Sequence, residues 1–406
     1  MDDRPGWARR MVEERAARNW SQLEAVRALH PRLPAEPFMS EQDLLRQWKR
    51  WESGEVYPRK YAPAIAASFG TTTHAFFPVK GKRDGRAEIL AVSGMDTVDI
   101  LTRLRASDVD QATFDALRIT TDRLCCEYAY MPADQLLIEG RAWLGRVAGL
   151  QNQRLSLAQH REAIALAGQL ALLVGCVEYD SGIRRQAEAT RQAALLLGTE
   201  AGHLGIQGWA YEMKAWFALT SGDYRGVIAA ADAGLAAAPA ESVAVQLYAQ
   251  KAKAWARLRD RQQTEVALDA GRQLLERLPY PDSIENHFVV DPAKWDYYRM
   301  DAYRKVGEDQ LAQQLASEVL RADDGAERQP MRNAEARVTL AVVAARDGDL
   351  DTALSFGERA LSGDRRSLPS LAMVAGDLGA VLQERYGTVS EAQEFLQHLR
   401  SLRQGE

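Results

Sequence analysis

The chain has 406 residues, of which 46% are hydrophobic and 26% charged, and its formal net charge is −5. This length exceeds the roughly 50–250 residues that one hydrophobic core usually supports, so we expect at least two folded units. The composition excludes a mostly disordered chain, and no window approaches the roughly 18 uninterrupted apolar residues of a membrane span. The N-terminus, MDDRPGWARRM, lacks the apolar run of a secretory signal, which predicts a cytoplasmic protein with no membrane partner.

Charge and cysteine content narrow the class further. Residues 1–90 contain 16 Lys and Arg against 12 Asp and Glu, whereas the remainder contains 35 against 44, so the N-terminal part carries +4 and the rest −9. The three cysteines, Cys125, Cys126 and Cys176, fit a reducing compartment. No CxxC or HExxH spacing occurs, and we therefore expect no metal site and no cofactor.

Helical periodicity dominates the chain. Long segments carry apolar residues at helical spacing and are rich in Ala, Leu, Gln, Glu and Arg, whereas the best strand candidate is the short run AEILAV near Ile89. We predict an all-α protein with an N-terminal domain of four or five helices over residues 1–77. A linker over 78–95 and a helical repeat domain over 96–406 follow.

The N-terminal domain contains clear helix boundaries. Ser21 is a predicted N-cap for a helix over residues 22–29, and Glu24 at the third position completes a capping box. After a proline-rich segment, Ser40 can cap the next helix. That helix is expected to stop at Gly54.

This later helix, within SEQDLLRQWKRWESGE, has two chemically different sides. Leu44, Trp48 and Trp51 lie at i, i+4 and i+7 and are predicted to face the core. The other sides carry amides and cations, namely Gln42, Arg46, Gln47, Lys49 and Arg50. Arg pairs with guanine edges, Gln with adenine and Lys with phosphate, so these sides have the chemistry of a DNA recognition helix. The alternative is an ordinary amphipathic helix with a solvated charged face.

The order of these elements resembles the Xre family of helix-turn-helix proteins, which has the lambda-repressor-like fold. The residues that carry the resemblance are Ser21-Gln22, Trp51-Glu52-Ser53-Gly54, Pro58 and the apolar segment from Ile65 to Gly70. The segment HPRLPAEPFMSEQ between helices two and three departs from the family, which has a tight turn there. The resemblance implies a phosphate contact at the start of helix two, at Ser21 and Gln22. It also implies base contacts from Arg46, Gln47 and Arg50, with Gln42 on the same face, and phosphate contacts from Lys49, Arg59 and Lys60.

From about residue 96 the chain repeats as helix, turn, helix. Two segments, AYEMKAWFALTSGDYRGVIAAADAGLAAAP and AEARVTLAVVAARDGDLDTALSFGERAL, carry the marks of a tetratricopeptide (TPR) unit, with turns at Gly222-Asp223 and Gly348-Asp349. A small residue follows each turn at Ala187, Val227, Ala267, Ala312 and Ala353, at intervals of 40, 40, 45 and 41 residues. We predict a degenerate TPR-like α-solenoid of about six to eight helix pairs.

Counting back from two of the turns predicts which residues line a ligand or partner groove. These are Trp209, Glu212, Trp216, Lys294, Tyr297 and Arg304. Aromatic side chains beside charges suit a peptide or a flat small molecule as effector, although they could equally fill gaps between helices. His160, His203 and His287 are isolated in sequence and are expected to be surface or capping residues. No GxSxG or GxGxxG motif occurs, and we expect no catalytic residue.

The full chain, a helix-turn-helix domain followed by a TPR-like domain, resembles a group of actinobacterial regulators of development and secondary metabolism. The resemblance implies a sequence-specific transcriptional regulator that binds double-stranded DNA as a homodimer. The alternative is a TPR-like adaptor whose N-terminal domain serves a protein partner instead of DNA.

Overall fold

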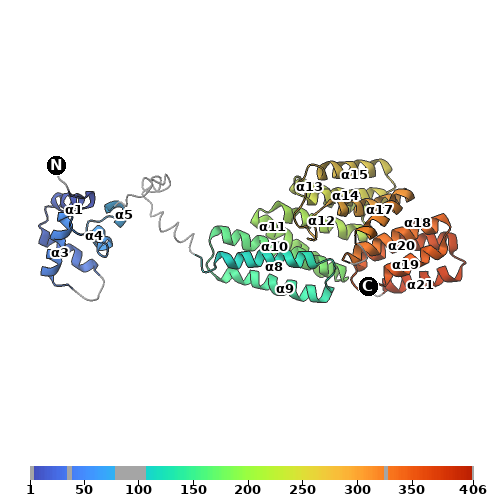
Figure 1. The fold of residues 1–406 in the computed structure, drawn as a ribbon, viewed down its shortest axis with the longest axis horizontal. Coiled ribbons are helices and arrows are strands. Elements are labelled where there is room, and N and C mark those ends of the chain that lie inside the picture. Colours follow the sequence, from blue (N-terminus) through green and yellow to red (C-terminus); the bar gives the residue numbers. More distant parts are fainter. Residues whose placement is uncertain (1–3, 34–38, 78–106, 324–327, 405–406) are drawn as a thin grey trace. The chain divides into compact units, whose positions relative to one another are not determined.

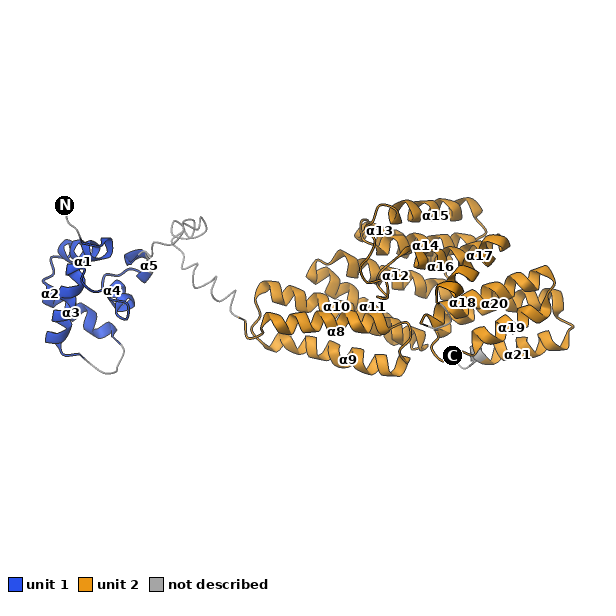
Figure 2. Ribbon diagram, in the orientation of Figure 1, with its two compact units in different colours: residues 1–98 blue, residues 99–406 orange. Residues whose placement is uncertain are grey.

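The computed structural model describes residues 4–33, 39–77, 107–323 and 328–404. Every regular element in these ranges is a helix, which confirms the predicted all-α class. The chain divides into two compact units, Met1–Val98 and Asp99–Glu406, which we call the head and the body (Figure 2). The predicted linker over 78–95 and the strand candidate near Ile89 lie outside the described residues.

The head consists of short helices (Figure 1). They are α1 (Gly6–Ala17), α2 (Gln22–Leu29), the 3-10 helix η1 (His30–Arg32), α3 (Glu41–Ser53), α4 (Ala62–Ser68) and α5 (Thr73–Phe76). The capping box at the start of α2 is confirmed: the Ser21 hydroxyl accepts from the backbone N–H of Glu24, and the Glu24 carboxylate accepts from the backbone N–H of Ser21. Such reciprocal bonds satisfy donors that a helix start leaves free.

The core of the head forms around the apolar side of α3. Leu44, Trp48 and Trp51 are at most 2% exposed, as predicted. The ring of Trp48 lies 6.1 Å from the rings of both Trp51 and Phe69, measured between centroids. Because large aromatic side chains bury the most apolar area, these contacts hold α3 against the rest of the head.

The body consists of longer helices that follow one another as antiparallel neighbours. They are α8 (Gln111–Glu127), α9 (Ala133–Gly149), the 3-10 helix η2 (Leu150–Asn152), α10 (Leu157–Asp180), α11 (Arg184–Ala201), α12 (Leu204–Thr220), α13 (Tyr224–Ala237), α14 (Val243–Arg257), α15 (Arg261–Leu275), α16 (Pro292–Val306), α17 (Asp309–Ala322), α18 (Pro330–Asp347), α19 (Leu350–Leu361), α20 (Leu368–Tyr386) and α21 (Ser390–Gln404).

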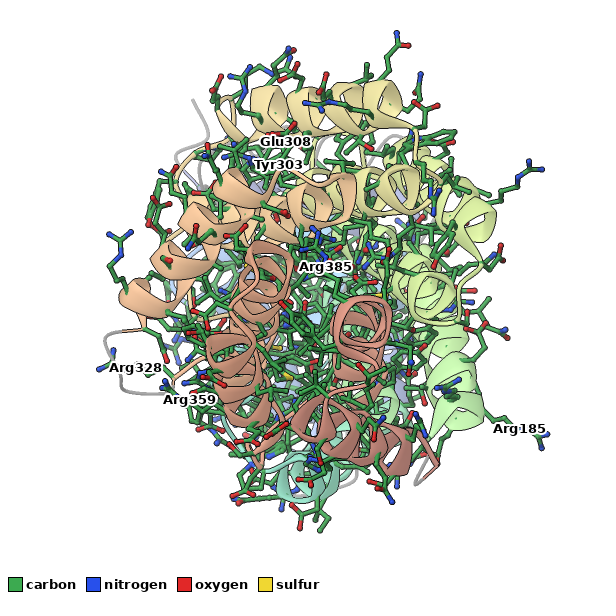
Figure 3. All side chains as sticks on the ribbon, turned by 90° about the vertical axis from the view of Figure 1, so that its right-hand side faces the viewer. Arg185, Tyr303, Glu308, Arg328, Arg359 and Arg385 are labelled. Carbon is green, nitrogen blue, oxygen red and sulfur yellow. The ribbon has the colours of Figure 1, made fainter. Side chains whose placement is uncertain are left out.

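From α10 onward the helices form six pairs, and the first helix of each pair packs against the first helix of the next. This inner layer runs through α10, α12, α14, α16, α18 and α20, and α20 also contacts α10 and α12. The inner layer therefore closes into a ring, whereas an ordinary solenoid stays open. Side chains such as Arg185 and Arg328 extend from the outer surface of the body (Figure 3).

The turns inside the pairs repeat one geometry. Gly222 and Gly348 have φ of +83° and +96°, a left-handed conformation that favours glycine. The next residues, Asp223 and Asp349, cap the second helices by accepting from backbone N–H groups. The small residues predicted after the turns are all buried, with at most 4% exposed at Ala187, Val227, Ala267, Ala312 and Ala353. These predictions are confirmed.

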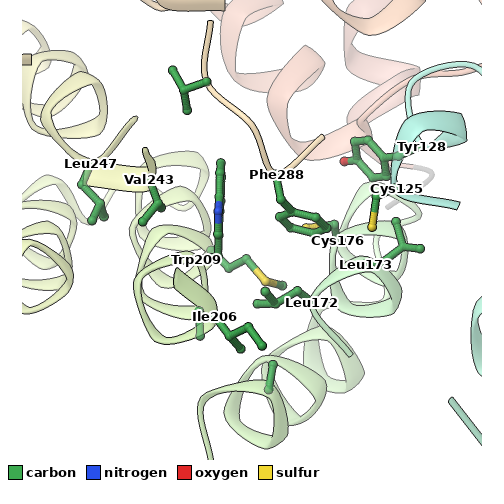
Figure 4. Packing of buried hydrophobic residues seen from close by; sticks show 14 of the residues in the cluster. Cys125, Tyr128, Leu172, Leu173, Cys176, Ile206, Trp209, Val243, Leu247 and Phe288 are labelled. Carbon is green, nitrogen blue, oxygen red and sulfur yellow. The ribbon is translucent and has the colours of Figure 1, made fainter. Parts of the chain in front are cut away.

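The main core of the body lies between α8, α10, α12, α14 and α16. Trp209 packs edge-on against Phe288 at 5.3 Å between ring centroids, beside Cys176 and Leu173 (Figure 4). By length and hydropathy α10 alone, among the described helices, could cross a membrane, but 78% of its most apolar window is buried by other helices. That burial is the environment of a core helix.

Candidate functional site

The first candidate site is the outward side of α3, whose two ends are fixed by local chemistry. The Ser40 hydroxyl accepts from the backbone N–H of Asp43 at 3.2 Å, as the sequence predicted for an N-cap. Gly54 ends the helix with φ of +86°. A Cβ at Gly54 would lie 2.5 Å from Cδ of Pro5, so glycine also permits the close approach of the chain before α1.

A buried carboxylate, Glu52, fixes the orientation of α3. Its oxygens accept from Arg15 Nε at 2.6 Å, Gln22 Nε2 at 2.8 Å and Trp48 Nε1 at 2.7 Å. Burial alone would raise the pKa of Glu52, but the hydrogen bonds from Arg15, Gln22 and Trp48 outweigh it and hold the pKa below its ordinary value. One charged group therefore joins α1, α2 and α3.

The predicted DNA-contact residues of α3 lie on its outer sides. The side chain of Arg46 is 77% exposed and lies 3.1 Å from a carboxylate oxygen of Asp43, and that of Arg50 is 51% exposed and lies 3.2 Å from Glu55. Gln42 and Lys49 are exposed, Gln47 is half-buried, and Arg59 and Lys60 are exposed in the segment before α4. The solvated side of α3 is thus cationic and amide-rich, with two of its arginines beside acids.

Two residues predicted to bind phosphate have roles inside the head. Ser21 is exposed and forms the capping box, and Gln22 donates to Glu52. The Gln22 amide thus takes part in joining the helices. Contact of either residue with DNA stays a prediction.

The second candidate site is a cavity of about 100 Å³ at the centre of the ring in the body. Every helix of the inner layer contributes to its wall. Four predicted groove residues line it, namely Glu212, Trp216, Lys294 and Tyr297. Counting back from the turns therefore found four residues that line this cavity, and their contact with a ligand or partner stays a prediction.

Two of the predicted groove residues, Trp209 and Arg304, do not line this cavity. Trp209 is 5% exposed and packs against Phe288 in the core. Arg304 is fully buried, and its guanidinium bonds to Asp301, to Thr339 Oγ1 at 2.8 Å and to Asp377 at 3.3 Å. Both side chains point between helices because neighbouring helices cover these positions, which periodicity within one helix does not reveal.

The cavity has a carboxylate held by two amides. Glu212 Oε1 accepts from Gln246 Nε2 and Gln250 Nε2, each at 2.7 Å. Burial raises the pKa of Glu212 above its ordinary value, although the two amide bonds act against that shift. The side chains come from α12 and α14, so this cluster also joins two adjacent pairs.

Two residues of the cavity wall, Lys294 and His287, carry basic groups. Lys294 Nζ donates to the carbonyl oxygens of His287 and Val289, the latter at 3.0 Å, and burial lowers the pKa of Lys294 to about 7. The ring of His287 lies 3.9 Å from that of Tyr128, between centroids, and lines the cavity. Burial and the nearby Lys294 hold the pKa of His287 well below its ordinary value, which favours the neutral imidazole.

The prediction that His287 is a surface or capping residue is therefore wrong. Its position follows from packing of the segment before α16 against α8, where its backbone N–H donates to the carbonyl oxygen of Cys125 at 3.0 Å. The other two histidines agree with the prediction. His160 is exposed, and His203 caps α12 by accepting from the backbone N–H of Ile206 at 3.3 Å.

Sequence reasoning missed several polar residues of the cavity wall, namely Asp180, Gln246, Gln250, Lys253, Arg332 and Ser367. A signal for three of them was present: Gln246, Gln250 and Lys253 lie at i, i+4 and i+7 of α14, on a face that is otherwise expected to be apolar. The structure shows that this polar stripe faces the cavity. Among the described residues, no three His, Cys, Asp or Glu side chains gather as a metal site would require.

No family model matches the chain, and no curated protein matches its sequence. The functional assignment therefore has to be argued from the two candidate sites.

Proposed function

We propose that this protein is a sequence-specific DNA-binding transcriptional regulator of the Xre type, with a TPR-like body that senses an effector. The observation that carries the proposal is the outward side of α3. It presents Gln42, Arg46, Lys49 and Arg50 to solvent while its aromatic side is buried. By the resemblance stated above, its target genes serve development or secondary metabolism.

The geometry of α3 supports this role. A helix of 13 residues is roughly 20 Å long, and the major groove of B-DNA accepts one α-helix. Glu52 fixes α3 against α1 and α2, so its arginines project from a rigid support. Rigid placement lowers the entropy lost when side chains bind base edges.

The proposed complex contains two copies of the chain on one DNA. Two heads double the contacts to phosphate and bases, and their half-sites lie about one helical turn apart. The central cavity of the body is the proposed effector site, because it combines aromatic walls with buried charged groups.

One observation favours the alternative of a TPR-like adaptor whose head binds a protein. Arg46 and Arg50 lie beside Asp43 and Glu55, an arrangement also found on ordinary solvated helices. DNA would have to compete with these acids for the two guanidinium groups. The adaptor would bind its partner in the absence of nucleic acid.

Fluorescence anisotropy with labelled DNA from the promoter of the protein's own gene tests the proposal. We expect binding that weakens as salt rises, and a loss of about 100-fold in affinity for Arg46→Ala combined with Arg50→Ala. The charge-matched control is Arg261→Ala combined with Arg272→Ala, since both side chains are exposed on α15 of the body. Equal affinity of the two double variants, or binding without salt dependence, contradicts the proposal.

A further inference from the structure

Unpartnered polar atoms are concentrated at the central cavity. In the described part of the chain seven buried side-chain nitrogen or oxygen atoms have no hydrogen-bond partner, and four of them belong to residues of the cavity wall. These four are Asp180 Oδ1, Gln246 Oε1, Gln250 Oε1 and Ser367 Oγ. Leaving a buried polar group unpaired costs about 1–3 kcal/mol, so native proteins rarely gather several at one place without a ligand.

The hydrogen bonds already formed by these residues determine whether the free atoms can donate or accept. Asp180 Oδ2 accepts from the Tyr128 hydroxyl at 2.6 Å and from Arg365 at 3.0 Å, which leaves Oδ1 as a free acceptor. Gln246 and Gln250 both direct their N–H₂ groups at Glu212 Oε1, and so their carbonyl oxygens must turn away from it. Three of the four free atoms can only accept hydrogen bonds, and the matching ligand group is a donor of several.

The same cavity contains cations without carboxylate partners. Lys253 is 5% exposed, and its Nζ lies 4.7 Å from the ring centroid of Tyr298 and 5.5 Å from that of Tyr297. The Arg332 guanidinium lies 5.8 Å from the ring centroid of Tyr297. Within the described ranges neither cation forms an ion pair, although the carboxylates of Glu212 and Glu335 in the wall attract Lys253 at longer range. An anionic ligand group in the cavity could form a direct ion pair with both Lys253 and Arg332.

The spacing of donors and acceptors limits the ligand. Gln246, Gln250 and Lys253 lie along one face of α14, and the helical rise places Lys253 roughly 5 Å beyond Gln250 and roughly 10 Å beyond Gln246. The cavity of about 100 Å³ could hold roughly seven to ten waters, if each needs about 10–15 Å³. The matching ligand therefore has a similar size. It carries a hydrogen-bond donor group at one end and an anionic group at the other, a few bonds apart.

We infer that the central cavity binds a compact zwitterion, either a free amino acid or a dipeptide. Its ammonium group donates to the free oxygens of Asp180, Gln246 and Gln250, and its carboxylate binds Lys253 and Arg332. A phosphate or another simple anion would leave the acceptors unpaired, and an apolar ligand would leave both sets unpaired. The inference deepens the proposed function by naming the class of effector, and in that sense it rests on it.

Isothermal titration of the full chain without DNA tests the inference. The probes are the twenty common L-amino acids and a set of dipeptides, each alone, together with N-acetylated and C-amidated forms of every compound that binds. We expect at least one unblocked compound to bind, and blocking either end to weaken it at least tenfold. Binding of amino acids or of dipeptides decides between the two sources.

Matched variants locate the binding. Lys253→Met should weaken the zwitterion at least tenfold, whereas Lys251→Met should not, because Lys251 lies on the same helix but pairs with Asp232 outside the cavity. Arg332→Met serves as the second variant if circular dichroism shows that Lys253→Met does not fold. The inference is overturned if no unblocked compound binds, if blocked forms bind equally well, or if Lys251→Met and the cavity variants behave alike. DNA binding enters none of these titrations, so a failure here is separate from a failure of the anisotropy experiment.

Discussion

In the head one buried carboxylate, Glu52, accepts hydrogen bonds from three helices, and the network is complete. The body buries many more charged and amide groups, and those at its centre are incompletely paired. Incomplete pairing is not shared by every buried charge of the body. Asp301, also fully buried, accepts from both Arg257 and Arg304. Charges that pair directly, as at Glu52 and Asp301, stabilise the fold, whereas the unpaired acceptors gathered at the cavity are the basis for the inferred ligand.

The largest expected effect comes from removing Asp301, the buried carboxylate that accepts from both Arg257 and Arg304. Asp301→Ala leaves the buried guanidinium groups of Arg257 and Arg304 without their main partner, and should lower the free energy of unfolding of the body by about 3–5 kcal/mol. Hydrogen exchange measured by mass spectrometry reports each unit separately. Asp296→Ala is the control on the same helix, since its ion pair with Arg299 is partly exposed. Equal effects of the two variants would show that Asp301 does not hold the ring.

A smaller loss of stability, confined to the head, is expected for Glu52→Ala. Arg15, Gln22 and Trp48 then lose their shared acceptor, and the free energy of unfolding of the head should fall by about 2–3 kcal/mol. The control is Glu55→Ala, which removes an exposed carboxylate one turn away. Faster exchange in the body as well as in the head would contradict the expectation that the loss is confined to the head.

The Glu52 network also sets the response of the head to acid. Its pKa is lower in the folded head than in the unfolded chain, so its stabilisation is complete above the ordinary carboxyl pKa and is lost as pH falls through the folded value. The Glu52→Gln variant should remove this dependence in the same exchange experiment.

The stability of the body should depend on pH in the neutral to alkaline range because of Lys294. Its pKa in the folded body is about 7, and between pH 7 and about 10 the unfolded chain holds a proton that the folded body lacks. The stability of the body should therefore rise by about 1 kcal/mol per pH unit in this window, relative to Lys294→Met. Chemical denaturation of both proteins from pH 7 to 9 measures the difference. A constant difference would show that Lys294 keeps an ordinary pKa.

The smallest effect is expected for the exposed arginines of α3. Arg46→Ala or Arg50→Ala should change the free energy of unfolding of the head by less than about 0.5 kcal/mol, because solvent screens their ion pairs. Thermal melting of each variant beside the unchanged protein checks this. A larger loss would mean that weaker DNA binding by these variants reflects unfolding.

Features set by neighbours in sequence were predictable. Ser21 with Glu24, Ser40 and Gly54 mark helix ends because capping depends on residues only a few positions apart. The buried side of α3 and the small residues after the turns in the body follow from helical periodicity.

Features set by distant neighbours were not predictable. Trp209 and Arg304 lie on the predicted side of their helices, but residues far along the chain cover them. Asp180 becomes part of a site only because Arg365, 185 residues later, bonds to it. His287 reaches the cavity through a segment without regular structure, for which periodicity makes no prediction.

Closure of the ring has a consequence for how the body is made. Arg365 bonds to Asp180 and to the carbonyl oxygen of Tyr128, and Trp216 Nε1 donates to Ser370 Oγ at 2.9 Å, so the last helices complete the wall begun by the first. A chain emerging from the ribosome can stack its early pairs as they appear, but it cannot form the cavity until α20 has been synthesised. Truncation before α20 should therefore abolish ligand binding altogether, instead of shortening the body by one unit.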